Sequence, residues 1–192
     1  MGIPREPRLG WGHRRDYTRA SQISKHYLLG LLHDATVRLI TYRIATKSKD
    51  FSDFLVKGIK NLGMSAWNYK EGKNRDLWIT EFSKSLLKNV KIVSRQNKID
   101  YIRGYFDAEG GISKHSSVRF YIYFCQKDKD DLSEVKRYLE EIGISCGKMH
   151  NPSYKVDPNY WRFFVRARSY SKFAKIISSN HPDKITFLRM KI

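Results

Sequence analysis

The hydrophobic and polar positions of this chain repeat with the two periods that mark helices and half-buried strands. Apolar stretches at 24–34 and 98–109 predict two buried helices. The segments 53–63 and 131–143 place apolar residues at helical spacing among polar ones and predict amphipathic helices. Each of these two ends on a glycine, as helix C-caps favour.

Two later segments alternate between apolar residues and basic or aromatic ones, which is the period of a strand with one buried face. The inward set is Val118, Phe120, Ile122 and Phe124 in 118–124, and Trp161, Phe163, Val165 and Ala167 in 161–168. The outward set is Arg119, Tyr121, Tyr123, Arg162, Phe164, Arg166 and Arg168. One face of the predicted sheet is therefore apolar, and the other is basic and aromatic.

The chain contains the same unit twice, because five short matches occur in the same order in both halves. The matched pairs are 26–37 with 100–111, 46–50 with 126–130, 61–65 with 141–145, 78–88 with 164–174, and 98–103 with 184–189. The offset between partners grows from 74 to 80 and then 86 residues and never decreases, as insertions in a duplicated unit require.

Each copy predicts the order helix, strand pair, helix, strand pair, helix. Closing helices are expected at 83–93 and 169–179, and the short turns between strands predict antiparallel sheets with helices on one face. The fold class is therefore α+β with two αββαββα repeats. We divide the chain into a basic N-terminal arm at 1–22, a first repeat at 23–97 and a second repeat at 98–192.

Composition adds a strong positive charge to this picture. The 192 residues are 41% hydrophobic, enough for a packed core, while 37 Lys and Arg oppose 19 Asp and Glu for a net charge of +18. A globular chain this basic usually binds a polyanion, most often nucleic acid. Charge alone does not separate a DNA enzyme from an RNA-packing protein.

Cysteine use and hydropathy predict an intracellular protein that is not secreted. Cys125 and Cys146 occur without a Cys-x-x-Cys pair, which favours reduced, structural thiols. No stretch approaches 18 consecutive apolar residues, and the N-terminus lacks the apolar core of a signal peptide. We therefore expect no membrane partner.

The basic outward face favours DNA, because phosphate binding rewards surfaces of one sign and a two-stranded ribbon fits the major groove. The residues expected to contact DNA are Arg38, Arg43, Lys47, Lys114, Arg119, Tyr121, Tyr123, Arg162, Arg166 and Arg168. Nine or ten strand residues would span roughly 30 Å. At about 3.4 Å per base pair, two half-sites then predict a target of about twenty base pairs.

Two acids stand in the last turn of the helix predicted at 98–109. Asp107 and Glu109 precede a glycine pair that must end the helix. The negative end of the helix dipole disfavours acids there, so another group must compensate them. A metal ion is one such group, and Mg²⁺ binds through few carboxylates together with water and phosphate oxygens.

These stretches resemble a known family. The strings "IRGYFDAEG" at 102–110 and "LLGLLHDAT" at 28–36 are similar to the two motifs of the LAGLIDADG homing endonucleases. The resemblance implies two halves related by a pseudo-two-fold axis, with Gly30 and Gly104 allowing a close approach of the motif helices and the sheets forming a saddle for DNA. It also implies metal-dependent double-strand cleavage of a long, asymmetric DNA site by an intron-encoded protein.

The family pattern also implies site residues. Glu109 corresponds to the acid that binds metal, either Mg²⁺ or another divalent cation such as Mn²⁺. In the first copy that place falls on Ala35, with Asp34 one residue earlier. Either Asp34 is the metal ligand because its helix ends a residue early, or this half lacks its acid; we favour Asp34.

Further roles carry over from the family. Gln126, with Thr46 as its counterpart, is expected to organise water in the active site. Lys98 and Lys184 are paired by the repeat and are expected near the scissile phosphate, where a lysine could stabilise developing charge. His33 shows no ligand spacing and is expected to lie at the surface or contact DNA.

Three functions stay open on the sequence. The first is a DNA endonuclease acting as a monomer, because the two halves differ. The second is a maturase-like RNA-binding or DNA-binding protein on the same fold with one or no working site, which Ala35 favours. The third is a structural RNA-binding protein, although packing RNA needs no acid at a helix end.

Overall fold

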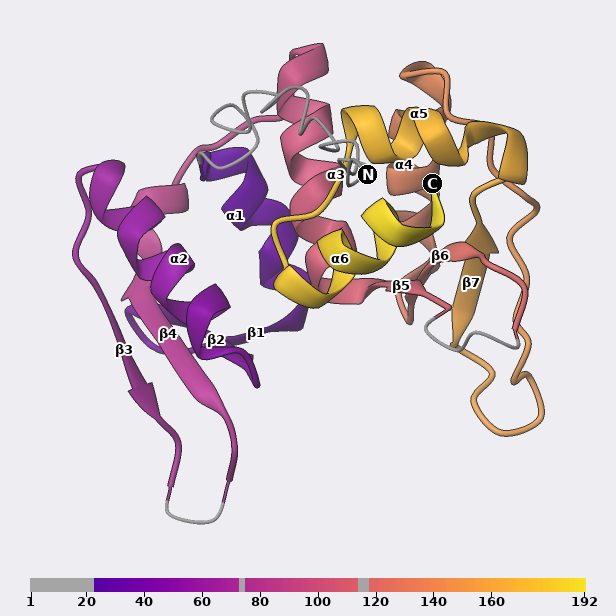
Figure 1. The fold of residues 1–192 in the computed structure, drawn as a ribbon. Helices are drawn as coiled ribbons and strands as arrows, with labels where there is room; N and C mark the ends of the chain where they lie inside the picture. Colours follow the sequence, from indigo (N-terminus) through magenta and orange to yellow (C-terminus); the bar gives the residue numbers. More distant parts are fainter. Residues whose placement is uncertain (1–22, 73–74, 114–117) are drawn as a thin grey trace, which may run out of the picture.

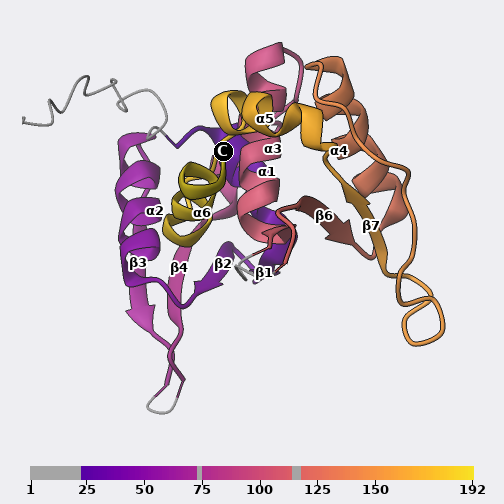
Figure 2. The same ribbon diagram turned by 45° about the vertical axis from the view of Figure 1, so that its right-hand side comes forward.

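The computed structural model describes residues 23–72, 75–113 and 118–192. The N-terminal arm expected at 1–22 and the DNA contact expected from Lys114 lie outside these residues. Figure 1 shows two lobes, each with its own sheet, on either side of a central pair of helices. Figure 2 shows the same arrangement after a 45° turn, with both sheets toward the end of the molecule where the central helices finish.

The central pair consists of α1 (Lys25–Leu31) and α3 (Arg95–Glu109). The hydroxyl of Ser24 accepts the N–H of Tyr27 at the start of α1, and Ser94 forms a capping box with Asn97 at the start of α3. A short 3₁₀ turn, η2 (Leu32–Asp34), continues α1.

Two glycines set the distance between these helices. A Cβ added at Gly30 would lie 2.0 Å from the carbonyl oxygen of Tyr101, and one added at Gly104 would lie 1.9 Å from the carbonyl oxygen of Tyr27. The two backbones therefore touch where they cross, as the sequence predicts, and no larger residue fits at either position.

The first lobe holds a four-stranded antiparallel sheet. Its strands are β1 (Ala35–Val37), β2 (Thr41–Thr46), β3 (Ala66–Lys70) and β4 (Trp78–Ser83), in the order β1-β2-β4-β3. The amphipathic helix α2 (Lys49–Asn61) covers one face of this sheet and buries Phe51, Leu55 and Ile59.

The second lobe repeats this plan in shortened form. Its strands are β5 (Gly110–Ile112), β6 (Ile122–Gln126) and β7 (Trp161–Phe164), in the order β5-β6-β7, with α4 (Lys129–Glu141) packed on them. The place of a fourth strand is taken by isolated bridges at Cys146 and His150. The remaining elements are η3 (Lys84–Leu87), η4 (Ala167–Ser169), α5 (Tyr170–Ile176) and α6 (Pro182–Lys191).

Each lobe has its own core of buried apolar side chains. One core gathers residues from Ile23 to Leu87 and the other gathers residues from Ile99 to Leu188. None of the helices in the described ranges has the length and apolar character that crossing a membrane requires. The α+β fold class with two related halves is confirmed.

Local structure departs from the sequence prediction in the first half. The helix expected at 83–93 is only the 3₁₀ turn η3, because Asn89 adopts a left-handed backbone with φ of 60° and ends it. Helix α3 begins at Arg95, so the expected repeat boundary after residue 97 falls inside its first turn.

The strands also differ from prediction. Val118 is 46% exposed rather than inward because β6 starts only at Ile122, and Ala167 is exposed because it opens η4. Phe163 and Phe124 are fully buried as expected. The longest strands have six residues, about 20 Å, so the 30 Å strand length was too long.

Candidate active site

The strand registers identify which residues of the two halves are equivalent. Ala35 pairs with Ile44 across β1 and β2, and Gly110 pairs with Phe124 across β5 and β6. Ile44 and Phe124 are partners at the repeat offset of 80 residues. Ala35 is therefore the counterpart of Gly110, and the residues just before them, Asp34 and Glu109, are counterparts too.

The 3₁₀ turn η2 compensates for a motif that is one residue shorter. Asp34 follows Gly30 by four residues, whereas Glu109 follows Gly104 by five. An α-helix rises about 1.5 Å per residue and a 3₁₀ helix about 2.0 Å, so three 3₁₀ steps and one α step advance about 7.5 Å, as five α steps do. Asp34 thus reaches the axial level of Glu109.

Glu109 is half-buried and held by groups at the end of β6. The side-chain amide of Gln126 donates to its Oε1 at 3.2 Å, and the thiol of Cys125 donates to its carbonyl oxygen at 3.4 Å. Burial and the nearby negative charge of Asp34 raise the pKa of Glu109, against the lowering effects of Gln126 and Lys184. Two mutually repelling carboxylates therefore meet here.

Asp34 projects to solvent while its neighbour packs inward. Ala35 packs against the core of the first lobe and opens β1. It therefore does not occupy the position of the acid in this half. The surrounding protein raises the pKa of the Asp34 carboxyl, and the positive charge of Lys184 lowers it.

Lys184 explains how the end of α3 carries acids. Its ammonium group donates to the carbonyl oxygens of Phe106 and Asp107 at 2.6 and 2.8 Å. A cation at a helix C-terminus offsets the negative end of the dipole. Lys184 therefore lies near both acids, with its ammonium group bound to the backbone at the end of α3.

Asp107 is fully enclosed and ties the central helices to the C-terminal segment. Its carboxylate accepts the hydroxyl of Tyr27 at 2.7 Å, the hydroxyl of Ser179 at 2.5 Å and the N–H of Asn180 at 2.9 Å. Its pKa is raised by burial and lowered by Lys184. Asp107 is thus an interface residue and not part of the solvent-facing acid pair.

Lys98 does not join the site. It lies in the first turn of α3, pairs with Glu141 at 2.5 Å and packs on the ring of Tyr138. Eleven residues of helix separate it from Glu109, about 16 Å along the axis. The structure therefore places Lys98 away from Glu109, and the repeat equivalence with Lys184 does not hold in space.

Thr46 differs from its counterpart Gln126. Its hydroxyl accepts the N–H of Ser48 and contributes to the start of α2. The described contacts therefore assign a carboxylate-binding amide to the second half alone.

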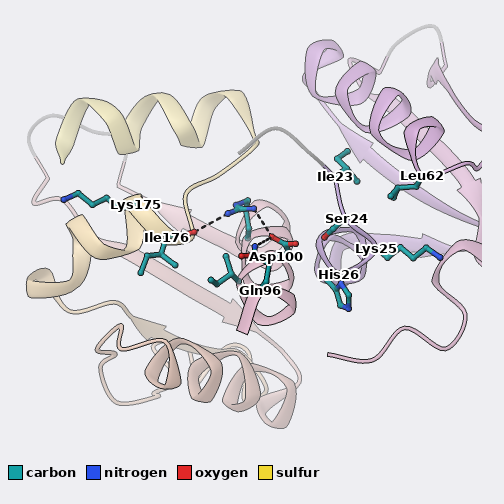
Figure 3. Close-up of a pocket in the computed structure, with 11 residues that line it drawn as sticks. Ile23, Ser24, Lys25, His26, Leu62, Gln96, Asp100, Lys175 and Ile176 are labelled. Atoms are coloured by element: carbon teal, nitrogen blue, oxygen red, sulfur yellow. Dashed lines mark hydrogen bonds and ion pairs between the residues drawn. The ribbon is translucent and has the colours of Figure 1, made fainter. Parts of the chain in front are cut away.

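A cavity of about 940 Å³ lies at the opposite end of the helix pair (Figure 3). It is lined near the starts of α1 and α3 by residues including His26, Gln96 and Asp100. Gln96 precedes Glu109 by thirteen residues, about 20 Å of helix. This cavity is therefore separate from the acid pair.

The outward face of the second sheet carries a cluster of aromatic side chains around one arginine. The Arg162 guanidinium lies 4.6 Å from the ring centroid of Tyr123 and donates to Tyr160 at 2.7 Å. Tyr121 packs edge-on against Phe164 with centroids 5.6 Å apart. The structure thus brings Arg162, Tyr121 and Tyr123 together, as the alternation predicts.

The other expected contacts of this half are more scattered. Arg166 and Arg168 are exposed and bind the 145–146 segment, where Arg166 donates to the carbonyl of Cys146 and Arg168 to the hydroxyl of Ser145. Arg119 precedes β6 and lies near Tyr170. They flank the aromatic surface rather than extend its alternation.

The outward face of the first sheet has mixed charge. Arg43 pairs with Glu71 and lies over the ring of Tyr69, and Glu81 stands opposite Arg43 in the ladder. Arg38 and Lys47 are exposed at the two ends of β2. This half offers less net positive charge to DNA than the second half does.

Sequence reasoning missed one cluster at the site. His33, expected at the surface, is half-buried with its Nε2 2.8 Å from the hydroxyl of Tyr101 and its Nδ1 3.2 Å from the carboxylate of Asp131. Tyr105 also donates to Asp131 at 3.1 Å. These residues come from both repeats, so spacing along the chain holds no signal for the cluster.

The carboxylates of Asp34 and Glu109 are suitable ligands for a divalent cation that also binds a phosphate. Within the described ranges, no three His, Cys, Asp or Glu side chains gather as a metal site by themselves. Two carboxylates whose charges repel would gain from a cation, and Mg²⁺ accepts few carboxylates when water and phosphate oxygens complete its shell. The residues present therefore fit a metal bound together with DNA.

The crossed helices, the two sheets and the acid pair together match one known fold. The chain has the single-chain, two-repeat LAGLIDADG fold, and residues 96–178 match the family described as LAGLIDADG-like domain. It is 24% identical over 180 residues to the homing endonuclease I-ApeI of Aeropyrum pernix, covering 92% of this chain and 73% of that protein.

Solved structures share the fold. I-DmoI in complex with DNA and Mn superposes with a TM-score of 0.60 at 21% identity, covering 82% of this chain and 97% of that one. Other I-DmoI complexes contain Ca, or were obtained in the presence of Mg. The N-terminal LAGLIDADG domain of DUF199/WhiA matches with a TM-score of 0.60 at 12% identity, over 92% of this chain and 98% of that one.

Proposed function

We propose that this chain is a homing-type, site-specific DNA endonuclease that uses divalent metal to cleave both strands of a long asymmetric site. The observation that carries the proposal is the register equivalence of Asp34 and Glu109. It supports one acid from each half at the meeting point of the crossed helices. The named homing endonucleases I-ApeI and I-DmoI support the same activity class.

In this proposal, neighbouring side chains position and ionise the carboxylates that would lie beside a phosphodiester. Asp34 and Glu109 end their helical segments toward the end of the molecule that carries both sheets (Figure 2). Gln126 orients Glu109 by donating to one of its oxygens. Lys184, bound to the end of α3, lowers the pKa of both acids and favours the ionised forms that bind a cation.

A bound Mg²⁺ or Mn²⁺ would polarise the scissile phosphate, lower the pKa of an attacking water and stabilise the leaving oxygen. Asp34 and Glu109 are the protein groups that would hold it. Because few protein ligands are available, DNA would supply part of the coordination shell. Metal affinity should therefore be low without DNA and should rise when DNA is bound.

The sheets are the DNA-binding surface in this proposal. Arg162, with Tyr121 and Tyr123 beside it, would contact one half-site. The first sheet, where Arg43 is paired with Glu71, would contact the other with less net charge. The two faces differ, so we propose that one chain binds one long asymmetric site. Intron encoding stays a prediction.

Plasmid cleavage tests this function. A plasmid library of candidate insertion sites is incubated with wild type, Glu109→Gln and Asp34→Asn, in Mg²⁺ and in EDTA. Linear product from wild type that both variants and EDTA abolish supports the proposal. Asp130→Asn, an exposed acid of α4, is the matched control and should cut normally. Two chains per DNA in a sedimentation experiment would refute the monomer.

A second candidate is a nucleic-acid-binding protein that nicks or does not cut. The shortened first motif favours it, because Asp34 depends on a 3₁₀ turn for its place. The LAGLIDADG domain of WhiA shares the fold, so the fold alone does not decide cleavage. Nicked circles unaffected by Asp34→Asn would indicate a single working acid. Tight, selective binding to intron RNA without cleavage would indicate a maturase-like role.

A further inference from the structure

The two motifs reach their acids through different backbone structures. Helix α3 runs to Glu109 in regular α-helical form, and the N–H of Gly110 donates to Phe106 at its end. Asp34 instead ends a three-residue 3₁₀ turn, whose hydrogen bonds have poorer geometry. Such a turn holds one conformation only if contacts outside it fix its side chains.

His33 supplies those contacts from the middle of the turn. Its ring lies 4.3 Å from the ring of Tyr105 by centroids and meets Tyr101 edge-on at 5.9 Å. Asp131 is a carboxylate that can only accept, so Nδ1 carries the proton donated to it. Nε2 is then free to accept the hydroxyl of Tyr101 at 2.8 Å, a closer acceptor for that proton than Oδ1 of Asp131 at 3.4 Å.

The anchor belongs to the opposite repeat. Tyr101 and Tyr105 lie on α3, and Asp131 lies in the first turn of α4, where its own N–H binds the N-cap residue Asp128. Tyr105 is fully buried and donates to Asp131 at 3.1 Å. The carboxylate is therefore held by a contact that does not involve the histidine. The 3₁₀ turn of the first repeat is thus held by side chains of the second repeat.

The two repeats anchor their motif ends in a related way. His33 and Asp107 are counterparts at the offset of 74 residues that relates Gly30 to Gly104. Asp107 binds Tyr27 of the other motif helix together with the 179–180 segment. At each motif end, one polar side chain therefore binds the opposite half, one or two residues before the acid.

We propose that His33 is the positioning residue for Asp34, acting through Asp131, Tyr101 and Tyr105 to hold the 3₁₀ turn that presents the acid. This rests on the proposed nuclease function. His33 touches no reacting atom in the proposal. Its loss should misplace Asp34, and misplacement by about 1 Å can cost about 100-fold in rate.

The test compares His33→Ala, His33→Asn and Asp131→Asn with the wild type, and Asp130→Ala serves as the control in the same turn of α4. His33→Asn keeps a donor near the place of Nδ1, and Asp131→Asn keeps an acceptor. For each protein we would measure the single-turnover cleavage rate at saturating DNA, the Kd for DNA, and amide hydrogen exchange.

His33→Ala is expected to cut about 10- to 100-fold more slowly, with Kd changed less than about twofold, since a positioning loss leaves DNA contacts intact. Exchange should quicken at 32–37 but not at 110–113. His33→Asn and Asp131→Asn should recover most of the rate, and Asp130→Ala should match the wild type.

An unchanged cleavage rate in His33→Ala, or unchanged amide exchange at 32–37 in that variant, would overturn the inference. So would rate loss matched by faster exchange throughout the chain, which marks general destabilisation. If the wild type cuts no DNA, the proposed function fails instead. The exchange comparison would then still decide whether His33 holds the turn.

Discussion

Replacing Gly104 with alanine separates the two central helices. The added Cβ would lie 1.9 Å from the carbonyl oxygen of Tyr27 and 2.9 Å from the N–H nitrogen of Leu31, whereas ordinary contacts begin near 3.4 Å. Both neighbours are backbone atoms of α1, so no side-chain rotation relieves the clash. The helices must move apart by about 1.5 Å at the crossing.

The movement should reduce both stability and activity. Overpacking a core typically costs about 1 to 3 kcal/mol, and here backbone must shift, which favours the upper part of that range. For a chain of this size the melting temperature falls about 2 to 4 °C per kcal/mol. Asp34 and Glu109 end the same helix pair, so a 1.5 Å displacement should also lower the cleavage rate by about 100-fold or more.

Urea denaturation and single-turnover cleavage check this prediction. Gly147→Ala is the matched control, since its Cβ would meet Phe164 at an ordinary 3.4 Å with no left-handed backbone. A Gly104→Ala protein whose unfolding free energy stays within about 0.5 kcal/mol of wild type, the usual range of a surface substitution, would refute the close backbone contact.

Three further outcomes follow from the contacts around the site. Tyr27→Phe removes a buried hydrogen bond to Asp107 and should cost about 1 to 3 kcal/mol in urea denaturation, whereas Tyr154→Phe, 70% exposed, should cost nothing measurable. Glu109→Gln should raise the melting temperature of the metal-free protein at pH 7, because a raised carboxyl pKa penalises the folded state once the group ionises. The gain should vanish below about pH 4.3, the unfolded value, and a constant gain at all pH values would contradict it. Glu81→Gln should tighten DNA binding at low salt and less so at high salt, with Glu134→Gln on α4 as the control. An equal effect of both, or none from Glu81→Gln, would remove Glu81 from the DNA-facing surface.

Much of the architecture was predictable because it depends on local periodicity and duplication. The 3.6-residue period marks α2 and α4, and the two-residue period marks the buried side chains Ile122 and Phe124. Duplication then gives the same order of elements in both halves, and the family resemblance implied that the two motif helices pack together. Asp107 and Glu109 were identifiable as unusual acids at a helix end, and the family resemblance then singled out Glu109.

Failures arose where a long-range contact overrides local pattern. The repeat matches Lys98 to Lys184, yet Glu141 binds the first and the end of α3 binds the second. The helix expected at 83–93 stops as the 3₁₀ turn η3, and Asn89 beyond it has a left-handed backbone. No local signal separates the two lysines.

The sequence by itself determined the two-repeat α+β plan, because periodicity and duplication are visible along the chain. The close glycine crossing and the expected role of Glu109 came from the resemblance to a known family. Only the tertiary structure supplies an argument for Asp34 over Ala35. That choice depends on pairing with Ile44 and on a 3₁₀ turn anchored by Tyr101 and Asp131 from the other repeat. Such contacts join residues 68 and 98 positions apart, and their energy appears only when the two halves pack.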